Sequence, residues 1–413
     1  MRISTANSFD VGVDTLTRRQ AELSTTQERM SSLKRVNSAS DDPAAAARAE
    51  RALARIARTE ANQRAVDAAS AAMSQVEGAM GDATNLLQQV RETLVAAGNA
   101  SYTASDRLTL ADKLSSLREQ LFMTANRSDG AGGFLFGGQG STQAPFVDAP
   151  GGVVYRGTAG QAQTEQSTGM PLSADGEAVW MSGRRGNGVF ETRPLVNATT
   201  SDLPRSVQID GGQVVNPSTF YAVPPSTYAI TFNTAASPVT YNVDRTPLPP
   251  AAPTTVTVQT GTFVSGQAIV LDGMSFTVSG TPQTGDSFEI RPSTPDLDVF
   301  EVLDKAVADL RASNRSGTQL AQSNADNLRH VDAVLSNVLS ARSAAGDVLN
   351  QVDAETERSG NQKLAAQTER SNAEDLDMIQ AISDFQNQQT SYDAALKSYA
   401  MVQRMSLFQY ING

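Results

Sequence analysis

Apolar residues recur at alternating steps of four and three residues over the N-terminal part of the chain. One such stretch covers residues 9–30, and a second covers residues 45–97 without a break in the pattern. This spacing predicts α-helices that pack side by side as in a coiled coil. Asp42 before Pro43 predicts the start of the second helix, with an N-cap residue followed by proline at the first helical position. A third, shorter helix is predicted over residues 106–126.

The same spacing returns in the C-terminal part of the chain. Helix is predicted from about Leu297, with its clearest heptads over residues 328–352. Ser371 and Glu374 have the spacing of a capping box, which predicts that the last helix begins at Ser371. The core positions of that helix are predicted over residues 382–403. Because no single helix can bury its apolar stripe alone, the helices of the two chain ends are expected to pack against one another.

The middle of the chain has a different pattern. Sixteen of the seventeen prolines lie between Pro145 and Pro295, which is incompatible with long helices there. Short segments alternate apolar and polar residues, and Gly, Pro, Asn or Asp residues bound them, as expected of antiparallel strands. The clearest of these segments are residues 226–232, 254–260, 268–273, 275–280 and 287–292. A break between two lobes is predicted near residues 197–204, and an extended loop over residues 246–254.

The predicted fold is therefore of the α+β class. A long coiled-coil shaft would be built from both chain termini, with an antiparallel β domain of two lobes inserted between them. The shaft would continue into an inner domain made of the two terminal helices. The predicted boundaries are residues 1–42 and 371–413 for the inner domain, 43–140 and 297–370 for the shaft, 141–200 for the first lobe and 201–296 for the second.

Composition and charge exclude several classes of function. The net charge of −11 and the pI near 4.7 argue against a nucleic-acid partner. The chain has no cysteine, which excludes disulfides and thiolate chemistry. No apolar run approaches the length of a membrane span, and the first residues lack the apolar segment of a cleaved signal peptide. These features predict a protein that contacts neither membranes nor nucleic acids.

Candidate catalytic and metal-binding groups have structural interpretations. His330 is the single histidine, and without cysteine it has no partners for a metal site. The glycines of residues 130–140 lack the GK[ST] ending of a P-loop and suit tight turns between helix and strand. The acids at residues 374–377 lack EF-hand spacing and are expected to stabilise the first turn of a helix. We therefore expect no catalytic residue, cofactor or metal.

Glutamine occupies predicted core positions in both terminal helices. Gln20 and Gln27 lie in the first, and Gln389 and Gln403 in the last. Polar core residues reduce stability and specify a partner, so these helices are expected to order only against neighbouring subunits. The alternative is that the true contact line is shifted and the glutamines face solvent.

Two stretches resemble bacterial flagellins. They are RVNSASDDPAAAARA at residues 35–49 and SARSAAGDVLNQVD at residues 340–353. Two further stretches resemble the hook-associated protein 3 branch of that family, which forms hook–filament junctions. They are GAGGFLFGGQGSTQAPF at residues 130–146 and QQTSYDAALKSYAMVQRMSLFQYING at residues 388–413. The resemblance covers about 130 residues at the front and about 115 at the back.

This resemblance implies a structural role and not an enzymatic one. It implies export through the flagellar type III channel without a cleaved signal peptide, and an extracellular ring of identical subunits between hook-associated protein 1 and the flagellin filament. It also implies a cytoplasmic export chaperone that binds the C-terminal helix. The segment of residues 197–295 is long for the shorter members of this family.

The expected functional residues are apolar. Assembly contacts are predicted on the terminal helices at Phe9, Val13, Leu16, Leu23, Met30, Ile382, Phe385, Tyr392, Leu396, Tyr399, Leu407 and Phe408. The joint between helices and β domain is predicted at Phe134, Leu135 and Phe136. Three alternatives stay open at this point: a flagellin-like filament subunit, an enzyme carried in the inserted domain, and a cytoplasmic coiled-coil scaffold.

Overall fold

A computed structural model describes residues 5–99, 101–164, 169–197, 199–250 and 254–411. The chain forms two compact units, one of residues 1–64 and 354–413 and the other of residues 65–353. Helices α2 (Pro43–Ala97) and α7 (Gly317–Glu374) contribute to both units. Each unit is described separately below.

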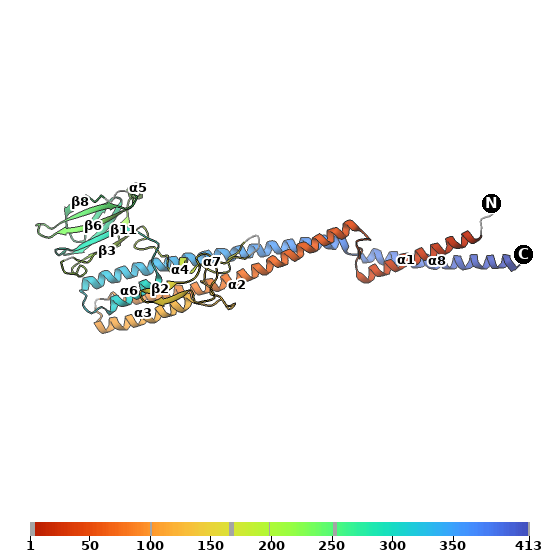
Figure 1. The fold of residues 1–413 in the computed structure, drawn as a ribbon, viewed down its shortest axis with the longest axis horizontal. Helices are drawn as coiled ribbons and strands as arrows, with labels where there is room; N and C mark the ends of the chain where they lie inside the picture. Colours follow the sequence, from red (N-terminus) through yellow and green to blue (C-terminus); the bar gives the residue numbers. More distant parts are fainter. Residues whose placement is uncertain (1–4, 100, 165–168, 198, 251–253, 412–413) are drawn as a thin grey trace. The chain divides into compact units, whose positions relative to one another are not determined.

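The long elements of the first unit are all helices, and an antiparallel bridge between Lys34 and Asp375 joins the segments that connect them. Helix α1 (Thr5–Ser32) packs along α8 (Met378–Ile411), and the first part of α2 packs along the last part of α7 (Figure 1). The start of α2 confirms the sequence prediction, because Asp42 Oδ1 accepts hydrogen bonds from the amides of Ala44 at 3.1 Å and Ala45 at 2.9 Å. Proline at the first helical position needs no such acceptor.

The predicted start of the last helix is wrong. Ser371 lies inside α7, which continues to Glu374, and α8 begins only at Met378. Asp377 caps α8 instead, because its Oδ1 accepts from the amides of Ile379 at 3.0 Å and Gln380 at 3.2 Å. A Ser-x-x-Glu spacing inside a continuous apolar pattern therefore did not mark a helix start here.

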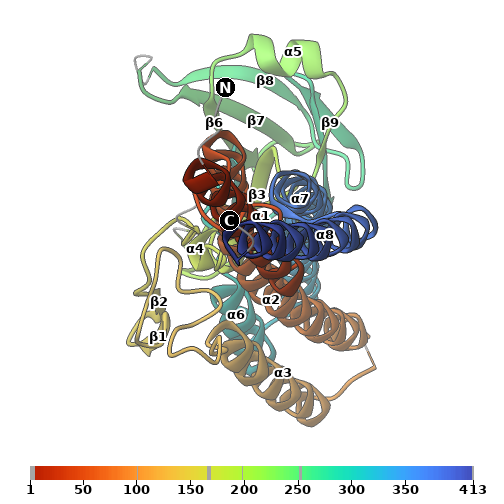
Figure 2. The same ribbon diagram turned by 90° about the vertical axis from the view of Figure 1, so that its right-hand side faces the viewer.

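The second unit contains a helical core. Helices α3 (Ala104–Ala125) and α6 (Val299–Arg311) pack against one another, and their apolar residues join those of α2 and α7 in one cluster. The hairpin of β1 (Phe146–Ala149) and β2 (Gly152–Tyr155) and the short helix α4 (Gly176–Trp180) cover one side of this cluster, with β2 beside α6 (Figure 2). Trp180 is fully buried there and stacks on Phe300 with 6.0 Å between ring centroids.

The second unit also carries a β domain with its own apolar cluster. A five-stranded antiparallel sheet has the order β3-β11-β6-β7-β8. A second sheet has β10 at its centre, paired antiparallel with β4, β5 and β9. The strands are β3 (Phe190–Pro194), β4 (Val207–Ile209), β5 (Gln213–Val214), β6 (Ser226–Asn233), β7 (Thr240–Pro247), β8 (Val256–Thr262), β9 (Ala268–Leu271), β10 (Met274–Gly280) and β11 (Ser287–Pro292). The short helix α5 (Pro217–Ala222) connects β5 to β6.

The α+β class and the inserted antiparallel β domain are confirmed. The five segments predicted as strands correspond to β6, β8, β9, β10 and β11, whereas β7 and the shorter strands β1 to β5 were not among them. The break predicted near residues 197–204 does not divide the strands, because β3 precedes it and pairs with β11 beyond it. Of the predicted loop over residues 246–254, residues 246–247 belong to β7 and residues 251–253 lie outside the described residues.

The β domain leaves the helical core and returns to it at one point. Gly183 and Leu297 form an antiparallel bridge in which each amide donates to the other's carbonyl, at 3.1 Å and 2.9 Å. The apolar cluster of the helices includes Leu297, and that of the β domain begins at Phe190. The two ends of the insertion are thus adjacent, and the two clusters share no residue.

Candidate functional site

The contact between α1 and α8 uses small residues at several of its core positions. A Cβ atom on Gly12 would lie 3.1 Å from the ring of Tyr399, and Thr26 Oγ1 donates to Gln388 Oε1 at 2.8 Å. These two contacts show that the helices run antiparallel. The buried and half-buried positions of α8 include Ala381, Phe385, Gln388, Tyr392, Ala395 and Tyr399. Their steps alternate between four and three, as a coiled-coil contact requires.

Large apolar side chains remain on the outside of this helix pair. We refer to them as the outer apolar set; they are Val11, Val13, Ile379, Ile382, Leu396 and Met401. Ile379 is 84% exposed, and Ile382 and Leu396 are 43% and 41% exposed. Burying each such side chain would contribute about 1.5–3 kcal/mol, so an isolated helix pair leaves much apolar surface in water.

The predicted core line of the terminal helices is correct at every second position. Leu16, Leu23 and Met30 on α1 are half-buried, as are Phe385, Tyr392 and Tyr399 on α8. Val13, Ile382 and Leu396 are exposed, because the neighbouring Gly12, Ala381 and Ala395 occupy the contact instead. Phe9, Leu407 and Phe408 lie in helices, but their side chains are outside the described part of the structure. Gln20, Gln27 and Gln389 are exposed, which favours the shifted contact line considered above.

The predicted joint lies where the chain leaves α3. Leu135 and Phe136 are fully buried and Phe134 is half-buried. The Phe136 ring meets Trp180 edge-on with 5.4 Å between centroids, so this segment joins the helical core. Gly138 has φ 69° and its position lies against the carbonyl of Thr158, a place that admits no side chain.

A polar interface, which the sequence did not predict, joins the β domain to α7. Strands β3 and β11 place two charge pairs directly opposite one another on one face of the sheet. Glu191 Oε2 accepts from Arg291 Nε at 2.6 Å, and Glu289 Oε2 accepts from Arg193 Nε at 2.6 Å. Cross-strand pairs of opposite charge stabilise a sheet, and here they also give it a charged face.

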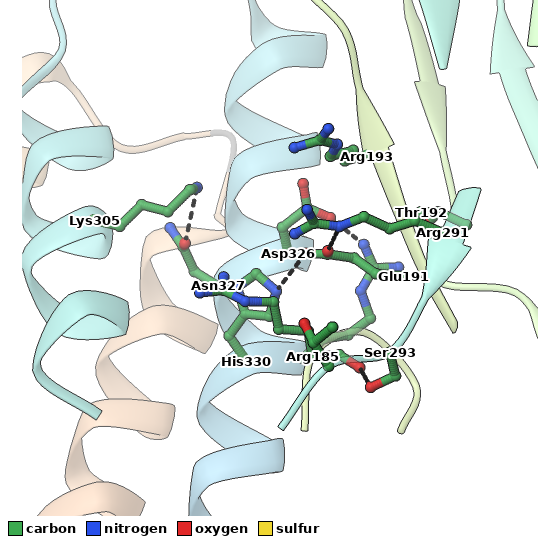
Figure 3. Close-up of polar contacts among 12 residues, drawn as sticks. Arg185, Glu191, Thr192, Arg193, Arg291, Ser293, Lys305, Asp326, Asn327 and His330 are labelled. Carbon is green, nitrogen blue, oxygen red and sulfur yellow. Dashed lines mark hydrogen bonds and ion pairs between the residues drawn. The ribbon is translucent and has the colours of Figure 1, made fainter. Parts of the chain in front are cut away.

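Glu191 lies between the β domain and the helix (Figure 3). His330 Nε2 of α7 is 3.6 Å from Glu191 Oε1, and both side chains are buried. Burial raises the pKa of Glu191, but the neighbouring His330 and the hydrogen bond from Arg291 outweigh it and lower the pKa to about 2. The single histidine is therefore a structural residue that helps to hold the carboxylate ionised.

Amide side chains of α7 complete the polar interface. Gln322 Oε1 accepts from the amide of Ile209 at 2.8 Å, and Gln319 Nε2 donates to the carbonyl of Leu203 at 2.9 Å. Beside them lies a cavity of about 320 Å³ with charged walls. Asp326 faces this cavity, and burial raises the pKa of its carboxyl group. The hydrogen bonds from Gln319 and to Gln322, together with the Glu191–His330 contact, thus dock the β domain on α7.

The acids at residues 374–377 were expected to stabilise the first turn of one helix, but they lie where α7 ends and α8 begins. Glu374 ends α7, where its carboxylate accepts from Lys34 Nζ at 3.3 Å and from Arg370 Nε at 2.6 Å. Within the described residues, no group of three or more potential ligands could hold a metal ion. No helix in the described part is long and apolar enough to cross a membrane.

Comparisons with known proteins cover both ends of the chain. The family model of the bacterial flagellin N-terminal helical region matches residues 3–141, and that of the flagellin C-terminal helical region matches residues 328–411. Flagellar hook-associated protein 3 of Salmonella typhimurium is 27% identical over 417 aligned positions, which cover 99% of each chain. Flagellin B of Vibrio cholerae is 28% identical, but the match covers only 45% of this chain.

Solved structures give the same grouping. The crystal structure of hook-associated protein 3 from Legionella pneumophila superposes with a TM-score of 0.67 at 28% identity, and the match covers 77% of this chain and 97% of that one. FlgL of Xanthomonas campestris superposes with a TM-score of 0.66 at 27% identity, covering 78% of this chain and 99% of that one.

Proposed function

Because the chain belongs to the flagellin family, and because its similarity to hook-associated protein 3 extends over 99% of its length, we propose that it forms the junction ring between hook-associated protein 1 and the flagellin filament. The similarity to hook-associated protein 3 supports a structural role in the bacterial flagellum. In our proposal the chain forms a ring of identical subunits, with hook-associated protein 1 on one side and flagellin on the other. Flagellins match only part of this chain, so a filament subunit is the second candidate.

The outer apolar set is the observation that carries this proposal. Val13, Ile382 and Leu396 project from α1 and α8 although both helices have already buried a contact line. A helix pair with a second apolar surface is suited to packing against further helices of its own kind. Identical subunits and flagellin, which shares these terminal regions, are therefore the partners that we propose for it.

Incorporation into flagella tests the assembly surface. Ile382→Ser together with Leu396→Ser removes two members of the outer apolar set while leaving the α1–α8 contact in place. Gln389→Ser together with Lys397→Ser is the matched control, because both residues are exposed on the same helix. In a strain lacking the native protein, the control should restore filaments, and the first variant should be secreted without restoring them. Normal filaments with the first variant would refute the proposal, and label along the whole filament by immunogold would favour the flagellin alternative.

We also propose that the protein is exported unfolded and that a cytoplasmic chaperone holds its C-terminal helix beforehand. Before export, the half-buried Tyr392 and Tyr399 and the exposed Leu396 would form an apolar surface liable to aggregate. Replacing these three residues with serine should weaken chaperone binding by well over tenfold, since each buried side chain contributes about 1.5–3 kcal/mol. Calorimetry measures this change, and an unchanged affinity would locate the chaperone site elsewhere.

A further inference from the structure

The apolar core of the β domain opens at one end into a cavity beneath α5. Its volume is about 370 Å³, and it lies on the face of the five-stranded sheet that is opposite to Glu191. Aromatic and aliphatic side chains dominate its walls. They include Phe190, Phe220, Tyr221, Tyr228, Met274 and Ile290. Sites for small molecules are mostly apolar cavities of about 300–1,000 Å³ with few polar groups.

The wall of this cavity is held in place by polar contacts behind it. Tyr228 donates its hydroxyl hydrogen to Asp272 Oδ2 at 2.9 Å, and Arg245 Nη1 lies 3.1 Å from the same oxygen. Asp272 has φ 47° and Gly273 has φ 81°, so both residues occupy the left-handed region. A Cβ atom on Gly273 would lie 2.7 Å from the amide nitrogen of Phe220, which shows how closely this turn supports α5.

Helix α5 presents two aromatic rings at the cavity. None of its residues is buried, although Phe220 packs against Phe190 with 6.4 Å between ring centroids. The Tyr221 ring lies edge-on to Phe220 at 5.2 Å, and Tyr221 is 74% exposed. An aromatic ring that lines a cavity and stays this exposed offers a surface on which a flat ligand can stack.

One cation lines the cavity without a partner. Arg184 is exposed, and its side chain has no hydrogen bond or ion pair with another residue in the described part of the chain. The other arginine of the lining, Arg291, is engaged with Glu191 on the opposite face of the sheet. We propose that this cavity is a binding site for a small, flat aromatic anion, whose ring stacks on Tyr221 and meets Phe220 edge-on, and whose carboxylate pairs with Arg184. This site is independent of the junction function.

Binding of 2-naphthoate to the full-length protein tests the site. We expect saturable binding at one site per chain, measured by calorimetry. Arg184→Gln should weaken binding by about tenfold or more, because it removes a charge-assisted hydrogen bond. Arg156→Gln is the matched control, since Arg156 is exposed and lies outside the cavity lining, and it should leave the affinity unchanged. Tyr221→Ala should weaken binding by about fivefold, whereas Tyr221→Phe should retain it, because stacking needs the ring and not the hydroxyl group.

Two comparison ligands test the proposed class. The uncharged 2-naphthol should bind the native protein more weakly than 2-naphthoate does. The Arg184→Gln variant should bind 2-naphthol and 2-naphthoate with equal affinity. Cyclohexanecarboxylate, an anion without a flat ring, should bind weakly to both. Equal losses in Arg184→Gln and Arg156→Gln would indicate nonspecific attraction and overturn the proposal. The proposal would also be overturned if a proline-rich peptide displaced 2-naphthoate and no other aromatic anion did so. The natural ligand of the cavity would then be a peptide.

Discussion

Replacing Glu191 with glutamine should destabilise the β domain through the loss of one charge. The side chain keeps its shape, but Arg291 and His330 then face a neutral group. The folded protein lowers the pKa of this carboxyl from 4.5 to about 2. At about 1.4 kcal/mol per pKa unit, and discounted for partial screening by solvent, the ionised form contributes about 3 kcal/mol to the free energy of unfolding at neutral pH.

The same shift fixes the direction of the pH dependence. A lowered pKa stabilises the folded state above the unfolded value of 4.5, and this contribution is lost as the pH falls toward 2. Glu191→Gln should therefore remove about 3 kcal/mol at pH 7 and flatten the pH dependence between 4.5 and 2. Glu289→Gln changes the neighbouring pair on the same two strands, whose side chains are 43% and 23% exposed. Exposed pairs contribute about 0–1 kcal/mol, so this control should change little.

Hydrogen exchange of peptides from β3 and β11, followed at increasing urea concentration, measures the unfolding free energy of the β domain. Trp180 is the sole tryptophan and is buried among the helices, so its fluorescence reports separately on the helical core. If Glu191→Gln lies within about 0.5 kcal/mol of the native protein at pH 7, the polar interface does not stabilise the domain and the reasoning fails. An unaltered acid transition in this variant would refute it independently.

Three further substitutions have defined outcomes. Burial raises the pKa of Asp298 to about 6, so the folded protein loses stability as the pH rises from 3.8 to 6. Asp298→Asn should therefore raise the thermal midpoint at pH 7 by an amount that corresponds to at most about 3 kcal/mol, and should not raise it at pH 3. Calorimetric scans at the two pH values measure this difference. Gly12→Val should separate α1 from α8, because the added Cβ atom lies 3.1 Å from Tyr399, and faster proteolysis of the terminal helices with unchanged Trp180 fluorescence would show it. Gly138→Ala should lower the unfolding free energy by more than about 1 kcal/mol in urea titrations, since the position has φ 69° and lies against the carbonyl of Thr158; an unchanged midpoint would mean that this turn relaxes freely.

Periodicity predicted which segments are helices but only half of each contact line. At every second core position of a coiled-coil pattern, either of two adjacent residues could face the partner helix. Because larger apolar side chains usually fill a core, Val13 was predicted instead of Gly12 and Ile382 instead of Ala381. The structure takes the smaller residue in both places, because close approach of the helices leaves no room for a larger side chain. The sequence therefore predicted where the helices meet but misjudged whether Val13 and Ile382 face inward.

The polar interface could not be predicted in the same way. Glu191 and Arg291 are 100 positions apart in sequence, and only the pairing of β3 with β11 brings them together. His330 suggested no function because its partner lies in another domain. The cavity beneath α5 likewise depends on a turn at Asp272 that supports a distant helix. Local patterns specify elements, whereas these contacts depend on how the elements assemble.

The bridge between Gly183 and Leu297 determines how the second unit responds to mechanical force. A rotating flagellum would pull on this unit through its helices, and the covalent chain between α4 and α6 passes through the whole β domain. The two hydrogen bonds between Gly183 and Leu297 connect the two ends of the insertion directly. Tension can therefore pass between the segments that flank the β domain without stretching its strands. The β domain can therefore stay folded under torque for as long as this bridge and the packed helices around it hold.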